Sequence, residues 1–246
     1  MALYKFGKKP AVHDHRTLMM CNYITSVLPP PPSQYNSLDR LNKNLGIADV
    51  PTLFPMDGND QFGDCTMAAA AHAVTNYRGL VRQKFIPATD DVTKQYFDLS
   101  GGEDSGLVEL DVLKYWYNTG LFGDKIKAFV KLAKRSHSDV KQAIVLFGGA
   151  YIGFEVQENA ISDFENHKIW EPGPTDGRGH AVYLIGYNSD GPLVLTWGDI
   201  QPASWEWYDQ MVDEAYATLP PEAASPEFTP GFDFATLQKD LNIITA

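Results

Sequence analysis

The chain has 246 residues and a formal net charge of −11, and 44% of its residues are hydrophobic. This length and composition are typical of a folded protein with a sizeable core and exclude a disordered chain. The negative charge argues against the basic surface that nonspecific nucleic-acid binding needs, and no apolar run approaches the roughly 20 residues of a membrane span. We therefore expect neither a nucleic-acid partner nor a membrane partner.

The cysteines and the polar N-terminus bear on where the protein works. Two cysteines, Cys21 and Cys65, cannot form a disulfide framework, so the fold must depend on its core. The first residues, "MALYKFGKKPAVHDHR", carry positive charge with no apolar stretch behind them, which is not the pattern of a secretory signal. We expect a protein that is cytoplasmic or carried in a phage or similar particle.

Residues 1–57 are rich in proline and show no regular hydrophobic pattern. The run "LPPPP" at 28–32 indicates an extended polyproline segment. We expect an extended arm that lies along the folded body, with a propeptide as the alternative. His13 and His15 in this arm are too few to bind a metal ion, and the sequence implies no metal and no organic cofactor.

Three segments that follow the arm have helical patterns. The alanine-rich run that starts at Cys65 predicts a helix packed closely on its neighbours, with Asp64 as its N-cap. A second helix is expected within 106–120. A third is expected within 137–149, with Ser138 as cap and Gly148 as stop.

The second half of the chain changes to strand patterns. Short runs rich in aromatic and β-branched residues are typical of strands, and they lie at 150–156, 180–187, 192–197 and 214–219. Helices first and strands afterwards predict an α+β protein. We assign residues 58–220 to this body.

The C-terminal part of the chain holds most of the negative charge. Between residues 199 and 246 there is a single base, Lys239, and many acids, which favours a solvated acidic tail. Residues 221–246 are expected to form this tail and to end in a short amphipathic helix. Its apolar positions are Phe234, Leu237, Leu241 and Ile244. We expect this helix to dock on the body, with a partner protein as the alternative.

Cys65 has two possible roles, a small buried filler or a nucleophile. A thiolate is stabilised by a helix N-terminus and by a histidine that can carry charge. Cys65 has the first if the helix starts there. His180, at the start of an apolar strand behind two glycines, is the candidate for the second, although a strand histidine can equally be a buried residue bonded to backbone.

Five segments resemble the papain-like cysteine peptidase family, in the order that this family uses. They are "QFGDCT", "DLSGGEDSGLVELDVLKYWYNTGL", "SDVKQAIVLFGGAYIGFEV", "GHAVYLIGY" and "LVLTWG". The resemblance runs from about Asn59 to Trp205 and suggests a divergent bacterial or phage-type member. It implies a papain-like fold of two subdomains, a helical half that carries Cys65 and a β-rich half that carries His180.

The resemblance also implies roles for single residues. Cys65 would be the nucleophile, His180 the base, and an amide six residues before the cysteine the oxyanion donor. That position is Asn59, and Gln61 is the alternate if the loop is shorter here. Glycines of the second segment would meet the substrate backbone, and Trp197 would shield the catalytic pair. The glycine candidates are Gly106 and the pair Gly101 and Gly102.

Two positions depart from the family pattern. Thr66 follows the nucleophile where the family has tryptophan, and Leu195 stands where the family has the asparagine that orients the histidine. Thr196 or Asp199 would have to replace that asparagine. A missing third residue weakens catalysis without abolishing it.

We therefore expect a thiol-dependent hydrolase that cleaves peptide or amide bonds through a thioester. The alternatives are a catalytically weak or inactive papain-fold protein with a structural or interaction role, and an acyl transferase or deamidase that uses the same Cys-His pair. The sequence leaves the oligomeric state open.

Overall fold

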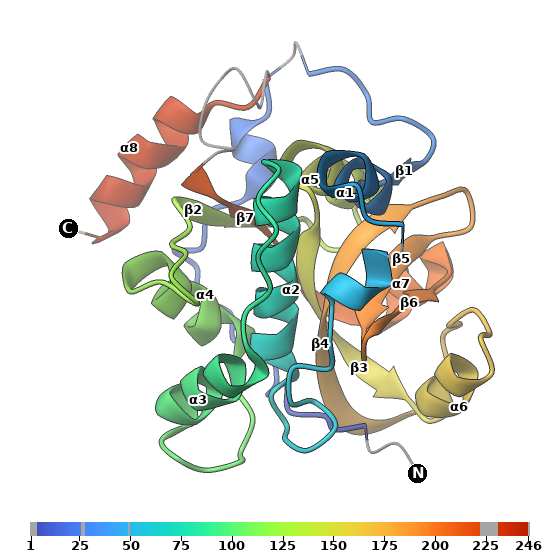
Figure 1. Cartoon of the computed structure of the whole chain (residues 1–246). Coiled ribbons are helices and arrows are strands. Elements are labelled where there is room, and N and C mark those ends of the chain that lie inside the picture. The colour runs from blue at the N-terminus through green and yellow to red at the C-terminus, as the bar shows by residue number, and fades with distance from the viewer. Residues whose placement is uncertain (1–3, 26–27, 49, 222–230, 246) are drawn as a thin grey trace.

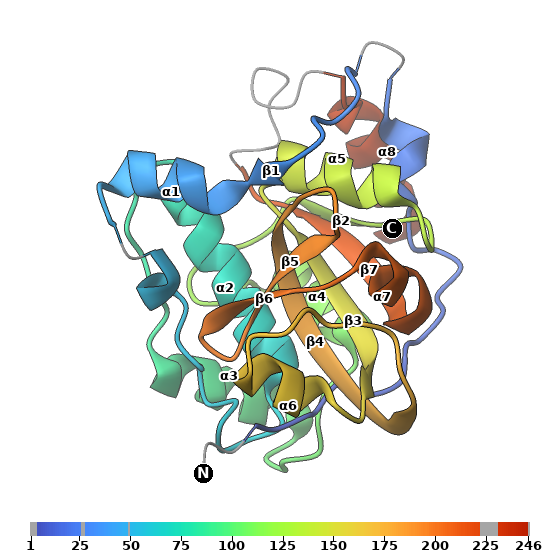
Figure 2. The same cartoon turned by 90° about the vertical axis from the view of Figure 1, so that its right-hand side faces the viewer.

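The computed structural model describes residues 4–25, 28–48, 50–221 and 231–245. Helix α2 stands in the middle of the molecule, with α3 and α4 on one side and a twisted sheet on the other (Figure 1). Helix α5 crosses one end of the sheet (Figure 2). Among the described residues, no helix is both long and apolar enough to span a bilayer.

The described residues form eight α-helices, which are distributed from the N-terminal to the C-terminal part of the chain. They are α1 (Ser37–Leu45), α2 (Cys65–Leu80), α3 (Thr89–Ser100), α4 (Glu109–Asn118), α5 (His137–Phe147), α6 (Ala160–Glu165), α7 (Trp205–Met211) and α8 (Phe234–Thr245). Two short 3-10 helices, η1 (Met20–Tyr23) and η2 (Val50–Leu53), lie among them.

The strands form one antiparallel sheet in the order β2-β7-β3-β4-β5-β6, and β1 pairs with β4 off this path. They are β1 (Tyr35–Asn36), β2 (Ala128–Lys131), β3 (Ala150–Gln157), β4 (Thr175–Tyr187), β5 (Pro192–Thr196), β6 (Asp199–Pro202) and β7 (Val212–Leu219). The sequence-based α+β assignment is confirmed, and β3, β4, β5 and β7 lie at the four predicted strands, with β5 ending one residue before the predicted end.

Helix α2 is buried along nearly its whole length, and β4 packs against it. A helix that is apolar on all sides has to lie in the core, and its alanines let neighbouring elements approach closely. The hydroxyl of Tyr151 in β3 donates to the carbonyl oxygen of Thr66 at 3.0 Å. The sheet therefore fixes the first turn of α2, where Cys65 lies.

The predicted helices, one starting at Cys65 and the others within 106–120 and 137–149, are present as α2, α4 and α5, and one of the two predicted caps is wrong. Ser136, not Ser138, caps α5: its hydroxyl accepts the N–H of Asp139. Asp64 is at the N-cap position of α2, as predicted, although its side chain makes no capping bond. Both of its carboxyl oxygens are buried without a hydrogen-bond partner among the described residues.

The described part of residues 1–57 contains helical structure that the expected extended arm did not include. Helix α1 begins after Asn36, whose side chain accepts the N–H of Leu38, and ends at Gly46 in the left-handed conformation. It packs against α2. Asparagine before and glycine after an amphipathic nonapeptide were the signals for this helix.

The expectation of a solvated acidic tail from residue 199 onward is wrong for its first half. Most of residues 199–219 lie in β6, α7 and β7, and Glu214 is buried in the sheet. Helix α8 packs on the body through the buried Leu237 and Leu241, and Asp240 accepts the hydroxyl of Tyr23 at 2.8 Å. Residues 222–230 of the expected tail lie outside the described residues.

Candidate active site

Cys65 is the first residue of α2 and is 1% exposed. Burial raises the pKa of its thiol to about 12, while the backbone N–H groups of Ala181 and Gly7 act in the opposite direction. Because Ala181 directly follows His180 in β4, the sulfur lies beside the strand that carries His180. The thiol is therefore neutral in this state of the protein.

His180 lies within β4, opposite Phe154 of β3, rather than at the start of the strand. Its Nε2 is 2.8 Å from the hydroxyl oxygen of Thr196, and its Nδ1 is buried without a hydrogen-bond partner among the described residues. Trp197 stacks on the imidazole with ring centroids 4.9 Å apart. Burial lowers the pKa of His180 to about 3, so the imidazole is also neutral.

Of the two predicted histidine-orienting residues, Thr196 is in contact with His180. Asp199 is exposed at the start of β6, where its carboxylate accepts the N–H of Ile200 at 2.7 Å. Leu195 is fully buried and pairs with Tyr183. Thr196, and not Asp199, is therefore the residue whose side chain contacts the imidazole of His180.

Of the two predicted oxyanion donors, Asn59 lies in the site and Gln61 is exposed. The side-chain oxygen of Asn59 accepts the indole N–H of Trp197 at 3.0 Å. Its amide nitrogen donates to the carbonyl oxygens of Lys5 and Phe62, each at 3.2 Å. Asn59 is thus held in place by Trp197 and Phe62, and its bond to Lys5 ties it to the N-terminal segment of the chain.

The chain's own residues 4–10, which we call the cleft segment, cross the site. In Figures 1 and 2 this segment passes beneath the end of α2 where the helix begins. Its backbone is hydrogen-bonded to the helical half, from Lys5 N–H to the Asn59 carbonyl (3.0 Å), and reciprocally with Leu107 (2.9 Å each). On the β-rich half, the N–H of Lys8 donates to the carbonyl of Gly179 at 3.2 Å.

An open groove of about 390 Å³ follows the cleft segment, lined by residues of both halves, among them Gly63, Asp104, Arg178 and Gly179. A Cβ at Gly106 would collide with the carbonyl oxygen of Gly7, so glycine is needed there for the backbones to meet. Gly101 and Gly102, the other predicted substrate-binding glycines, end α3 and have open space around them.

Sequence analysis missed the residues of the cleft segment itself. The ring of Phe6 packs edge-on against His180 and Trp197, and the guanidinium of Arg178 lies 4.4 Å from its ring centroid. Lys8 is buried, which is rare for lysine. The alternation of aromatic, glycine and lysine in "YKFGKK" was the only local signal.

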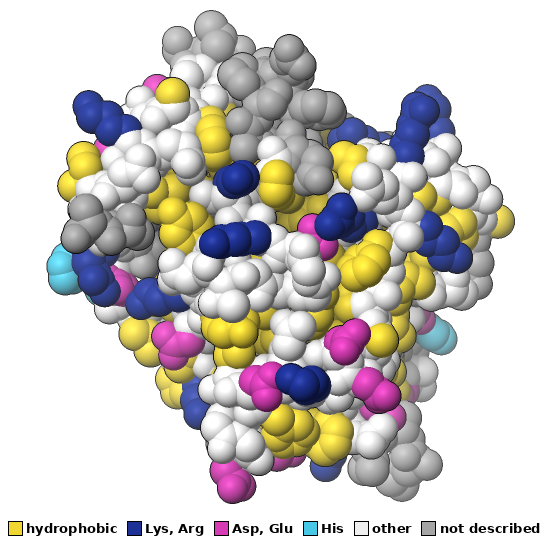
Figure 3. All heavy atoms as spheres, turned by 60° about the vertical axis from the view of Figure 1, so that its left-hand side comes forward, with side chains coloured by type: hydrophobic (Ala, Val, Ile, Leu, Met, Phe, Trp, Pro, Cys, Tyr) yellow, Lys and Arg dark blue, Asp and Glu magenta, His cyan; other side chains and the backbone are white. Residues whose placement is uncertain are grey.

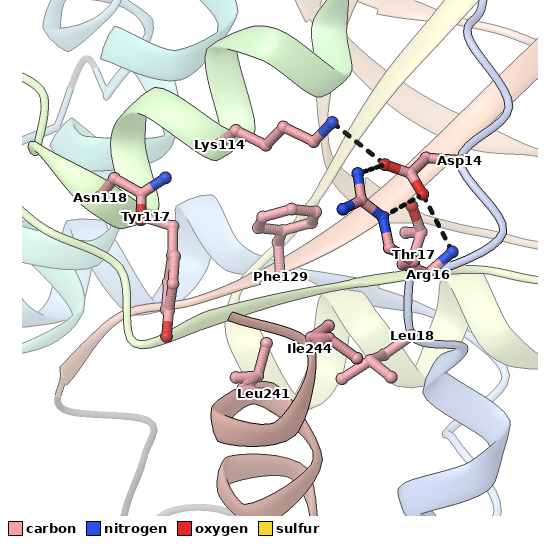
Figure 4. Close-up of a pocket in the computed structure, with 10 residues that line it drawn as sticks. All are labelled: Asp14, Arg16, Thr17, Leu18, Lys114, Tyr117, Asn118, Phe129, Leu241 and Ile244. Atoms are coloured by element: carbon pink, nitrogen blue, oxygen red, sulfur yellow. Dashed lines mark hydrogen bonds and ion pairs between the residues drawn. The ribbon is translucent and has the colours of Figure 1, made fainter. Parts of the chain in front are cut away.

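A second cavity, of about 260 Å³, lies between the N-terminal region, α4, β2 and α8. Figure 4 shows its apolar side chains facing one another, and Lys114 reaching Asp14, which also pairs with Arg16. Neither Cys65 nor His180 lines it.

Figure 3 brings this side of the molecule forward and shows hydrophobic side chains among Lys and Arg. The negative net charge of the chain therefore does not form one continuous acidic surface on this side.

The sequence matches no protein-family model and no curated protein. Several solved structures, however, have a fold similar to that of this chain. Xylellain, a cysteine protease from Xylella fastidiosa, is 16% identical with a TM-score of 0.64, over 88% of this chain and 96% of that one. A procathepsin B from Trypanosoma congolense is 13% identical with a TM-score of 0.65, over 88% of this chain and 86% of that one.

A digestive procathepsin L2 proteinase of Tenebrio molitor larval midgut is 12% identical with a TM-score of 0.61, over 88% of this chain and 78% of that one. Similarity of this extent, spread over both halves of the molecule, is a similarity of fold. The chain therefore has the papain-like α+β fold of the cysteine proteases, with a helical half and a β-rich half.

Proposed function

We propose that the chain is a thiol-dependent hydrolase of peptide or amide bonds, with Cys65 as nucleophile and His180 as base. The observation that carries the proposal is the cleft segment: an extended polypeptide lies in the groove, hydrogen-bonded on both walls, with Gly7 against the Cys65 sulfur. Such a groove is suited to hold a peptide bond next to a nucleophile. The substrate would be a peptide or protein.

The proposed reaction begins when a substrate replaces the cleft segment. His180, through Nδ1, takes the proton of Cys65 as the sulfur attacks the carbonyl carbon. The negative oxygen of the tetrahedral intermediate accepts the backbone N–H of Cys65 and the side-chain amide N–H of Asn59. His180 then protonates the leaving amine, and water, deprotonated by His180, hydrolyses the thioester.

The other site residues would position these groups. Thr196 fixes the ring of His180 through Nε2, which leaves Nδ1 free for proton transfer. Trp197 covers the imidazole and holds the oxygen of Asn59, and the amide N–H that now donates to Lys5 would be released for the oxyanion when the cleft segment leaves. A hydroxyl in place of a carboxamide or carboxylate gives less stabilisation of an imidazolium, so we expect slow turnover.

The cleft segment keeps this proposed enzyme inactive. With the segment in place, the pKa of Cys65 is about 12 and that of His180 about 3, so the thiolate–imidazolium pair is strongly disfavoured. Burial is the main cause of both shifts. Departure of the segment admits water and removes part of that cause.

The test is peptide hydrolysis by a full-length protein in which the segment has been displaced, for which Gly7→Ala is the suitable change. A peptide library is incubated with this protein and with the same protein carrying Cys65→Ala, and new peptide N-termini are detected by mass spectrometry. We expect cleavage only where Cys65 is present. Alkylation of Cys65 without any cleavage would favour a noncatalytic binding protein, and amide exchange with added amines would favour an acyl transferase or deamidase.

A further inference from the structure

Lys8 of the cleft segment places its side chain in a pocket of carboxylates. Its Nζ is 2.8 Å from Oδ2 of Asp213 and 3.1 Å from Oε1 of Glu214, both in β7. The side chain of Lys8 is only 1% exposed. Such burial of an ammonium group is costly unless it is paired, so this contact is a specific feature of the groove.

A third carboxylate, Glu109 at the start of α4, faces the same place. Glu109 is completely buried, and neither of its carboxylate oxygens has a hydrogen-bond partner among the described residues. A Cβ added at Gly153 would collide with Cε of Lys8 and lie 2.6 Å from Oε1 of Glu109, so the two groups meet beside this glycine. The missing side chain at Gly153 leaves room for the lysine stem.

The three carboxylates and the ammonium influence one another. The carboxylates raise the pKa of Lys8 in spite of its burial. Burial and mutual repulsion raise the pKa of Glu109, and burial raises that of Glu214. The pocket thus has more potential negative charge than a single lysine neutralises.

The position of Lys8 along the groove connects this pocket to the reaction site. Lys8 directly follows Gly7, which contacts the Cys65 sulfur, and its own N–H is held by Gly179. A peptide that replaced the cleft segment would bring one side chain to the same pocket. A neutral side chain would leave the buried carboxylates unpaired, whereas a cationic one would restore the pairing.

We propose that Glu109, Asp213 and Glu214 form a specificity subsite for a basic side chain of the substrate, and that Lys8 occupies it in the substrate's absence. This inference rests on the proposed function for its substrate, but the cation-binding pocket can be tested without any activity. The expected preference is for lysine-like side chains over neutral ones of equal length.

The first experiment restores the missing cation in the full-length Lys8→Ala protein. This change leaves a space the size of n-propylammonium, and we expect this ion to raise the melting temperature by about 2 °C or more, since binding to the folded state alone stabilises it. n-Propanol is the uncharged control, and Lys9→Ala, in an exposed neighbour, is the matched variant. Equal shifts with propanol, or equal shifts in Lys9→Ala, would overturn the proposal.

The second experiment compares peptides that carry lysine, norleucine or glutamate at one position and are cleaved by the Gly7→Ala protein. We expect kcat/KM to be on the order of tenfold or more higher for lysine, and this preference to fall in Glu214→Gln. Asp213→Asn, at a partly exposed residue, gives the same test if Glu214→Gln fails to fold.

The two proposals fail in different ways. Cleavage without preference for a basic residue would refute the subsite and leave the hydrolase. No cleavage of any peptide, together with selective stabilisation by propylammonium, would refute the hydrolase and the substrate role of the pocket, while the pocket itself would remain a cation site.

Discussion

Replacing Gly7 by alanine should force the cleft segment out of the groove. A Cβ at residue 7 would overlap the carbonyl oxygen of Gly63, an atom of the backbone just before α2. A flexible side chain could turn away from such a collision, but this backbone cannot, because Phe62 and Gly63 are tied to Asn59 and Asp104. The cleft segment, which is held by a few backbone hydrogen bonds and by the ion pairs of Lys8, is the part that moves.

The size of the effect follows from the bonds that the segment makes. Four backbone hydrogen bonds among the described residues hold it, through Lys5, Gly7, Lys8 and Lys9. At about 1 kcal/mol each, their loss shifts the balance between the occupied and the open groove by about 4 kcal/mol, or about 10³-fold. Loss of the Lys8 ion pairs adds to this figure.

Iodoacetamide labelling of Cys65, read by peptide mass spectrometry, measures this shift. Cys65 is 1% exposed and has to wait for the groove to open, whereas Cys21 is exposed and serves as an internal control in the same sample. We expect labelling of Cys65 in Gly7→Ala to be about 10²- to 10³-fold faster than in the wild type. Val12→Ala, at an exposed residue of the same region, should label like the wild type. An unchanged rate in Gly7→Ala would refute the reasoning.

Two further predictions concern residues close to the thiol. Asn59→Ala should lower kcat of the opened enzyme on the order of 10²-fold through loss of one oxyanion donor, while Gln61→Ala should have no effect; the opposite order would assign the role to Gln61. Burial raises the pKa of Asp64 to about 8, whereas the pKa of an aspartate in the unfolded chain is about 3.9. Between these two pH values the folded state keeps a proton on Asp64 that the unfolded state has lost. The free energy of unfolding therefore falls as pH rises through this window, by at most about 1.4 kcal/mol per pH unit. Asp64→Asn should therefore melt increasingly above the wild type from about pH 5 to about pH 8. A constant difference in melting temperature would contradict this.

The parts of the candidate site that lie in regular helices and strands could be predicted from the sequence. The alanine run after Cys65 predicted α2, and the apolar run that contains His180 predicted β4, because burial on all sides leaves a continuous hydrophobic pattern. The side-chain amide of Asn59 could be placed only by counting back from Cys65, and the structure puts it beside Trp197.

The parts that could not be predicted depend on long-range packing. Residues 4–10 form no helix, and an extended segment has no pattern that tells which surface it covers. The acids of 199–219 were counted as a tail because charge gives no information on burial. Glu109 and Glu214 are both buried, and only the tertiary structure brings them to Lys8.

The covalent connection between the cleft segment and the body determines how the groove responds to competitors. Residues 4–10 and the groove belong to one chain, so their encounter is intramolecular, with an effective concentration on the order of millimolar that dilution does not change. A free peptide would have to exceed that concentration or bind more tightly per molecule. One cut in the chain after residue 10 would convert the segment into an ordinary ligand that diffuses away, and the groove would then respond to the concentration of peptides around it.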